Sequence, residues 1–275
     1  MLLDLTIAIP VRNEEKNLPG CLEAIGKDFA QKIVVIDSGS TDRTKEITIE
    51  HKADILDFVW DGKFPKKRNW FLKNHTPSTK WILFLDADEY ITEDFKKELR
   101  EKLNAEDKVG YWLRYTIYFM GKKLKGGYPL KKLALFRVGS GEYEQIDEEK
   151  WSRLDMEVHE HPVLTGEIGH IKNKIDHKDF RDIGHYVNKH NEYATWEAER
   201  FINASKNDST TNNWTFKQRM KYRLMRSVWI GPVFLFCSFF LLGGFKDGVR
   251  GLVFAIFKMS YFTQVYCKIQ EKNVS

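Results

Sequence analysis

Short apolar runs alternate with amphipathic segments over the first hundred residues of the chain. The apolar runs cover residues 5–11, 32–37 and 81–85, and a short third strand is expected over 53–59 (ADILDFV), which also carries two aspartates. Uninterrupted runs of this length are typical of strands buried on both faces of a parallel sheet. Helices are expected between them, from about 13 to 25, 41 to 51 and 67 to 74. The alternation predicts an α/β fold whose sheet is covered by helices on both sides.

The pattern changes between Val109 and His177. Polar and apolar residues alternate there, with glycine-rich turns, as expected for an antiparallel or mixed part of a sheet. A helix is predicted over 177–201 and a polar loop over 204–213. We therefore expect a catalytic domain over 1–205, with a nucleotide-sugar half (1–105) and an acceptor half (106–205). A separate tail is expected over 206–275.

The tail is both basic and hydrophobic. It contains 11 Lys and Arg against 3 Asp and Glu, which is +8 in a chain of total formal charge +5, so the remainder carries −3. Residues 227–245 are uncharged, but Pro232 interrupts them, and a bilayer span takes about 20 apolar residues. Basic and aromatic flanks favour an interfacial helix or hairpin on an anionic membrane surface. A membrane span and ordinary core packing are the alternatives.

Two further features limit the location and the partners. Nucleic acid is not expected as a partner, because the basic residues flank apolar runs and not polar, glycine-rich ones. The three cysteines, Cys21, Cys237 and Cys267, are too scattered for a disulfide framework or a zinc site. With no recognisable signal peptide, a cytosol-facing location is expected.

The stretch KWILFLDADEY (80–90) carries the clearest chemical signal. Asp86 and Asp88 stand two residues apart after an apolar run, so both project from the same side of a strand end. A hard divalent cation shared with phosphate oxygens would relieve their repulsion. The pattern therefore indicates a metal-dependent nucleotide enzyme. The alternative is an ordinary strand followed by a helix capped by Thr92.

Four motifs follow one another in the first ninety residues: IPVRNEE, VVIDSGSTD, KKRNW and FLDADE. Together they resemble the nucleotide-sugar domain of family 2 inverting glycosyltransferases. Later segments, among them GGYP, LALFR and VHEHPVLTGEIGHI, resemble the branch with lipopolysaccharide core glucosyltransferases. The resemblance implies a GT-A nucleotide-sugar-binding fold, which is a Rossmann-like, mixed and mostly parallel sheet. The basic, hydrophobic tail adds membrane-associated C-terminal helices to this expected fold.

The resemblance also implies roles for individual residues. Asp37 would accept a hydrogen bond from the uracil ring N–H, and Asp86 would bind the ribose hydroxyls. A turn carboxylate is the alternative for Asp37, and a surface ion pair is the alternative for Arg68. Ser38 stands where the family usually has a second acid, as is common in this branch. The expected nucleotide-sugar site comprises Pro10, Val11, Arg12, Glu14, Asp37, Arg68, Asp86 and Ala87.

Asp88 is expected to hold Mg or Mn, with His177 as a second ligand or, alternatively, as a core or helix-capping residue. Inversion requires a carboxylate that takes the proton of the acceptor hydroxyl. The family's usual Glu-Asp pair is missing here. Glu160 is the predicted base, with Asp155 and then Glu157 as alternatives, and a structural pairing of Glu160 with His159 or His161 stays open.

A basic patch flanks the GGYP motif and comprises Lys122, Lys123, Lys125, Lys131 and Lys132. Such a patch can contact a lipid-linked diphosphate or membrane phosphates, but a solvated charge run is equally compatible with the pattern.

The sequence thus predicts an inverting hexosyltransferase on the cytoplasmic face of the inner membrane. The donor is expected to be a UDP-sugar, with UDP-glucose as a candidate. The expected acceptor is a lipid-linked saccharide in lipopolysaccharide or polysaccharide synthesis. A membrane-held scaffold that binds nucleotide sugars without turnover is one alternative. A nucleotidyltransferase is another, although VRNEEKN offers acids where a glycine-rich basic loop is usual.

Overall fold

The computed structural model groups the chain into two units, 1–121 with 130–180, and 122–129 with 181–275. The sequence predicted a boundary between the catalytic domain and the tail at 205/206, and this boundary stays a prediction. By compactness, the helix over 183–206 belongs with the C-terminal helices. The structure describes residues 2–104, 107–146, 151, 154–155, 157, 160–179, 181–206 and 216–274.

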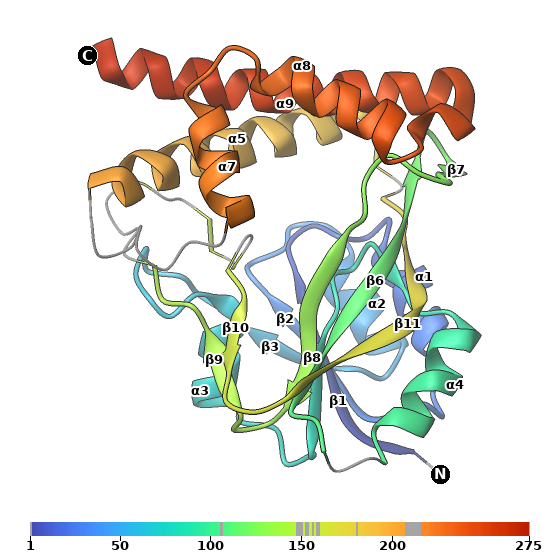
Figure 1. Ribbon diagram of the computed structural model, residues 1–275. Coiled ribbons are helices and arrows are strands. Elements are labelled where there is room, and N and C mark those ends of the chain that lie inside the picture. The colour runs from blue at the N-terminus through green and yellow to red at the C-terminus, as the bar shows by residue number, and fades with distance from the viewer. Residues whose placement is uncertain are drawn as a thin grey trace. The chain divides into compact units, whose positions relative to one another are not determined.

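A mixed sheet runs through the first unit in the order β3-β2-β1-β4-β8-β6-β11-β5 (Figure 1). Strands β3, β2, β1 and β4 are parallel, β8 is antiparallel to β4 and β6, β11 is parallel to β6, and β5 is antiparallel to β11. This confirms the predicted α/β fold with a mixed second half. The bounds are β1 Leu3–Val11, β2 Ala30–Asp37, β3 Asp54–Asp57, β4 Trp81–Phe84, β5 Glu89–Tyr90, β6 Gly110–Phe119, β8 Lys131–Arg137 and β11 Ile168–His177, with a separate pair β9 Gly141–Tyr143 and β10 Pro162–Leu164.

The central strands β1, β2 and β4 are buried on both faces over most of their length, which explains their uninterrupted apolar runs. Neighbouring residues of β1 enter different cores: Ile7 packs in one with Phe95, and Ala8 packs in the other with Phe71. The helices of the first unit are α1 Leu18–Ile25, α2 Thr44–Glu50, α3 Lys67–Asn74 and α4 Glu93–Lys102.

Helix bounds follow local capping chemistry. The bounds of α3 and the cap of α4 are as predicted, and Thr92 Oγ1 accepts a hydrogen bond from the Phe95 N–H at 3.2 Å. The predicted start of α1 near residue 13 is wrong. Asn13 has a φ of 55°, which lies outside the right-handed helical region, and the helix begins only at Leu18.

The second unit is mainly helical. Its core contains residues of four helices, among them Ala198, Met225, Ile230 and Phe262. The helix predicted from residue 177 begins later, because His177 is the last residue of β11. Residues 204–206, predicted as loop, are helical, and 207–213 lie outside the described residues. The elements are β7 Lys122–Lys123, α5 Ile183–Lys206, α7 Phe216–Met225, α8 Ile230–Phe236, η1 Cys237–Leu241, η2 Gly244–Asp247 and α9 Gly248–Val274.

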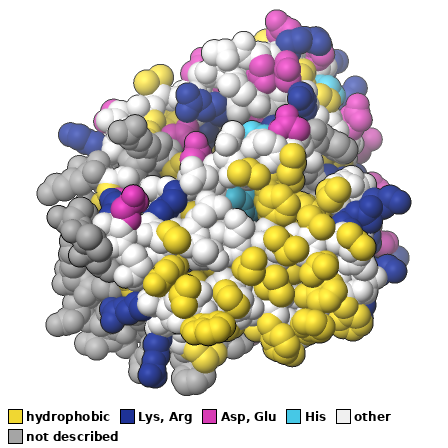
Figure 2. Space-filling model, turned by 90° about the horizontal axis from the view of Figure 1, so that it is seen from above, with side chains coloured by type: hydrophobic (Ala, Val, Ile, Leu, Met, Phe, Trp, Pro, Cys, Tyr) yellow, Lys and Arg dark blue, Asp and Glu magenta, His cyan; other side chains and the backbone are white. Residues whose placement is uncertain are grey.

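The C-terminal helices expose many large apolar side chains. Figure 2 shows them gathered on one surface, with Lys and Arg at its edge. In the part of the chain that the structure describes, no single helix has the length and hydropathy needed to cross a bilayer. The segments Ile230–Leu241 and Gly244–Lys272 meet these criteria only together, and a bend of 70° separates them.

Candidate functional site

The strand ends that carry the predicted site share one edge of the sheet. Val11 of β1 lies opposite Asp37 of β2, and Ala8 lies opposite Phe84 of β4. Asp86 follows β4 by two residues, so it emerges at the same edge. Ligands of parallel sheets bind beyond these carboxyl ends.

Asp37 is completely buried in this structure. Its carboxylate accepts hydrogen bonds from the N–H of Ser40, at 3.0 Å to Oδ2, and from the Ser40 hydroxyl. The ammonium of Lys45 lies 3.6 Å from Oδ2. Asp37 therefore closes the turn after β2, as in the alternative raised from the sequence. Its contact with a nucleotide base stays a prediction.

Asp86 lies between two cations. Its Oδ1 is 2.8 Å from Nη2 of Arg68, and its Oδ2 is 2.5 Å from Nζ of Lys132. Burial favours the neutral acid, but Lys132 and Arg68 together hold the pKa of Asp86 well below its usual range. Lys132 also binds Glu89, whose burial outweighs that attraction and raises its pKa. Asp86 is therefore ionised at neutral pH.

Arg68 is buried and not part of a surface ion pair, so that alternative is wrong. Its guanidinium carbon lies 5.4 Å from the Tyr143 ring centroid, and its Nη1 donates to the carbonyl of Glu157. The backbone of Tyr143 is held in turn by both side-chain amide atoms of Asn69, at 2.9 Å each. These contacts fix the orientation of Arg68 toward Asp86.

Glu157 caps the start of α3. Its two carboxylate oxygens accept hydrogen bonds from the N–H groups of Arg68 and Asn69, at 3.0 and 3.1 Å. Such bonds satisfy donors that a helix leaves unpaired in its first turn. Burial raises the pKa of Glu157 despite the nearby Arg68. This geometry assigns Glu157 a structural role.

The other two candidate bases pair with the lysines that precede Arg68. Glu160 Oε1 lies 3.1 Å from Nζ of Lys66, and Asp155 Oδ2 lies 3.3 Å from Nζ of Lys67. Lys67 also donates to the carbonyl of Val11 at 3.1 Å. Burial opposes ionisation of Asp155, but Lys67 lowers its pKa. The three candidate bases, Asp155, Glu157 and Glu160, are thus all bound by residues at the start of α3.

Asp88 and His177 come from different strand ends. In the pairing of β5 with β11, His177 lies opposite Glu89, next in sequence to Asp88. As a result, His177 Nε2 is 3.4 Å from Oδ2 of the buried Asp88. The two residues predicted as metal ligands are therefore neighbours. Among the described His, Cys, Asp and Glu side chains, no group of three is arranged to hold a metal ion.

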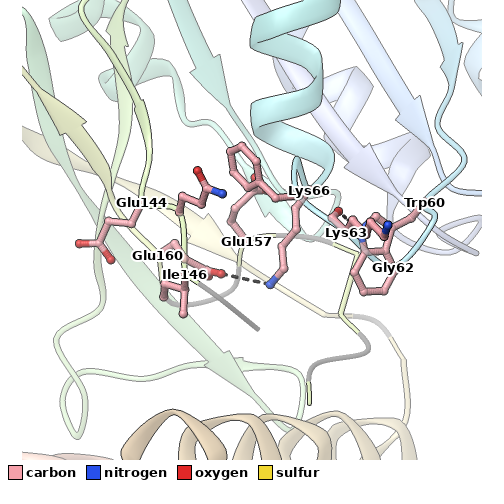
Figure 3. Close-up of a pocket in the computed structure, with 10 residues that line it drawn as sticks. Trp60, Gly62, Lys63, Lys66, Glu144, Ile146, Glu157 and Glu160 are labelled. Carbon is pink, nitrogen blue, oxygen red and sulfur yellow. Dashed lines mark hydrogen bonds and ion pairs between the residues drawn. The ribbon is translucent and has the colours of Figure 1, made fainter. Parts of the chain in front are cut away.

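A cavity of about 400 Å³ lies beside Glu160, between the segment that precedes α3 and the segment that follows β9 (Figure 3). The Lys66–Glu160 ion pair forms part of its wall. Its lining combines aromatic, acidic and basic side chains. The lining residues are Trp60, Gly62, Lys63, Phe64, Lys66, Glu144, Gln145, Ile146, Glu157 and Glu160.

Comparison with known families shows which family the chain belongs to. The family model described as glycosyl transferase family 2 matches residues 6–156, more than half of the chain. The chain belongs to glycosyl transferase family 2. It is therefore a glycosyltransferase that uses a nucleotide sugar, and the resemblance inferred from the four motifs is confirmed.

Relatives of this glycosyltransferase match different parts of it. The lipopolysaccharide core biosynthesis glycosyltransferase LpsC of Rhizobium meliloti is 23% identical over 283 residues, which cover 98% of this chain and 93% of LpsC. A TPR repeat-containing protein of Synechococcus elongatus is 34% identical over 110 residues, 40% of this chain and only 27% of that protein. Glucosyl-3-phosphoglycerate synthase of Mycobacterium tuberculosis, solved with Mn²⁺, UDP and glucosyl-3-phosphoglycerate, is 20% identical over 42% of this chain and 44% of its own, with a TM-score of 0.33.

The remaining predicted residues of the glycosyltransferase lie around the same strand ends. Pro10 and Ala87 are buried, and Arg12 is exposed. The carboxylate of Glu14 accepts a hydrogen bond from Asn17 Nδ2 at 2.8 Å. Their contacts with a nucleotide sugar stay predictions.

Lys132 and Lys66 were missed as parts of the site. In the sequence Lys132 belongs to the basic patch near GGYP, whereas in the structure it lies in β8 against Asp86 and Glu89. The sequence of β8 contained a signal for the position of Lys132. Lys132 stands two residues before Ala134, which packs in the core that contains Tyr115, so strand periodicity places both residues on the same face. Lys66 belonged to the KKRNW motif, but nothing in the sequence linked it to Glu160.

Proposed function

We propose that this glycosyltransferase moves a hexose from a UDP-sugar to a hydroxyl of a lipid-linked saccharide, with inversion at the anomeric carbon. The observation that carries the proposal is the juxtaposition of two pairs at the end of β4: Asp86 with Arg68, and Asp88 with His177. An oriented, ionised Asp86 suits ribose hydroxyls, which donate to carboxylates. UDP-glucose is the candidate donor.

A divalent cation, Mg²⁺ or Mn²⁺, fits the residues present. Asp88 offers a carboxylate oxygen and His177 offers a ring nitrogen. The distance between Asp88 Oδ2 and His177 Nε2 is 3.4 Å. Magnesium-type ions are typically bound by one or two carboxylates together with substrate phosphates and water. Asp88 and His177 would hold the cation from the protein side. When bound, it would neutralise charge on the departing diphosphate.

The chemical step is a displacement at the anomeric carbon. The acceptor oxygen forms a bond to this carbon, while the bond to the diphosphate oxygen breaks and its electron pair leaves with UDP. The acceptor proton passes to the carboxylate of Glu160. Lys66, 3.1 Å from Glu160, favours the ionised carboxylate before the transfer. Asp155, with Lys67, is the alternative base.

Binding of UDP tests the donor assignment directly. We expect calorimetry on the purified full-length chain to give Mg²⁺-dependent binding of UDP. Asp88→Asn should weaken this binding, and Asp94→Asn, on an exposed position of α4, should leave it unchanged. Equal binding with and without metal would overturn the metal assignment, and absence of UDP binding would overturn the donor assignment.

We further infer that the C-terminal helices rest on an anionic lipid surface, on the cytosolic side of the membrane. Support comes from the apolar face of α8 to α9, which we define by its exposed side chains, and from the basic side chains at its edge (Figure 2). The free cysteines agree with a reducing compartment. The name of LpsC also points to a lipid-anchored saccharide as acceptor. The apolar face comprises Trp229, Val233, Phe236, Phe240, Leu241, Leu242, Phe245, Val249, Leu252 and Ile256.

A further inference from the structure

The cavity beside Glu160 is separate from the residues predicted to bind the donor. Asp37, Asp86 and Asp88 do not line it, whereas Glu160, the predicted base, does. A general base must lie within hydrogen-bond reach of the proton that it removes. If Glu160 is the base, the acceptor hydroxyl must therefore enter this cavity. The cavity volume of about 400 Å³ falls within the range of small-molecule sites, roughly 300–1,000 Å³.

The lining has the chemistry of a saccharide site. A sugar ring has an apolar face of C–H groups, which favours burial against aromatic rings, and hydroxyls that bind charged groups. Trp60 borders the cavity on one side, and Glu144, Ile146 and Glu160 border it on the other (Figure 3). The indole N–H of Trp60 donates to the carbonyl of Lys63 at 2.7 Å. This bond fixes the ring, so that little side-chain freedom is lost when a ligand packs against it.

We propose that this cavity is the acceptor subsite, in which Trp60 packs against a sugar ring and Glu160 and Lys66 bind the hydroxyl that reacts. The inference rests on the proposed function, because it takes Glu160 as the base. It assigns the loop 60–66, before α3, to acceptor recognition. The nucleotide is bound elsewhere, at the ends of β1, β2 and β4.

Saturation-transfer NMR on the full-length protein tests this assignment. The probes are the methyl glycosides of glucose, galactose, mannose and N-acetylglucosamine, with UDP and Mg²⁺ in the same sample. We expect at least one glycoside to receive saturation. Trp60→Ala should weaken its binding by about tenfold or more, because the aromatic face is lost, whereas Trp60→Phe should retain most of the affinity. The matched control is Trp229→Ala, an exposed position of the second unit.

The UDP signal separates this inference from the donor assignment. Unchanged UDP signals in all variants, together with a glycoside signal lost only in Trp60→Ala, would support the subsite. No glycoside signal in the wild type, or an equal one in Trp60→Ala, would overturn it. A missing UDP signal in the wild type would instead contradict the proposed donor. If Trp60→Ala also loses UDP, Trp60→Leu, which keeps an apolar side chain without an aromatic face, takes its place.

Discussion

The ammonium group of Lys66 lies 3.1 Å from the carboxylate of Glu160, and the side chains of both residues are almost completely buried, 6% and 1% exposed. A buried carboxylate is costly unless it is paired, so Lys66 allows Glu160 to remain charged. The same pair lines the cavity next to α3. A charged acid at the wall of a cavity is what a base for an acceptor hydroxyl requires.

Replacing Glu160 by Gln removes the predicted base while keeping the shape of the side chain. We expect turnover to fall by at least about a hundredfold, since general bases contribute about 10²–10⁴. Calorimetric binding of UDP should be unchanged, because Glu160 is not among the residues proposed to bind the donor. If Glu160→Gln remains active and Asp155→Asn is inactive, then Asp155 is the base.

Glu157→Gln should affect stability and not the chemical step. The carboxylate accepts hydrogen bonds from two backbone N–H groups at the start of α3. The amide of Gln has only one oxygen, so its NH₂ group would face one of these N–H groups and leave it without an acceptor. Leaving such a buried donor unsatisfied costs about 1–3 kcal/mol, to be measured by denaturant unfolding. Loss of turnover at unchanged stability and UDP binding would contradict the structural role.

Asp86 should make stability dependent on pH in the acidic range. Its pKa is lower in the folded chain than in the unfolded chain, where an Asp has a pKa of about 3.9. Its ion pairs therefore stabilise the fold at neutral pH, and this contribution is lost as the pH falls below about 4. Asp86→Asn should destabilise by about 1–3 kcal/mol at pH near 7 and by less at pH near 3. Equal destabilisation at both pH values would show that the charge of Asp86 is not what matters.

Acidic residues on the apolar face should weaken membrane binding. Phe240 and Leu241 are 53% and 69% exposed, and burying such a side chain in lipid contributes roughly 1.5–3 kcal/mol. We expect Phe240→Glu and Leu241→Glu each to reduce flotation with phosphatidylglycerol vesicles by about tenfold or more. Ile49→Glu, on an exposed position of α2, is the matched control. If both variants float with the vesicles to the same extent as the wild-type chain, the proposed lipid contact is contradicted.

The sequence predicted what depends on local pattern. Apolar runs predicted β1, β2 and β4, and the spacing of Asp86 and Asp88 after β4 predicted two carboxylates at one strand end. These features follow from strand periodicity and from the way in which parallel strands end together.

The sequence did not predict contacts that depend on distant segments meeting. Glu160 and Lys66 are 94 positions apart, and Lys132 and Asp86 are 46 apart. Charge alone does not distinguish a solvated lysine from one that pairs with a buried acid. The late start of α1 had a similar cause, because the left-handed backbone of Asn13 depends on its contacts with the turn after β2.

The most direct test of the central claim is UDP release from a panel of UDP-sugars by the purified full-length chain. The assay is run with Mn²⁺, with Mg²⁺ and with EDTA, and a bacterial lipid extract supplies the acceptor. We predict release from one UDP-sugar that requires the metal and is lost in Asp88→Asn. No release from any UDP-sugar, or equal release by Asp88→Asn, would contradict transfer from a metal-bound UDP-sugar at this site.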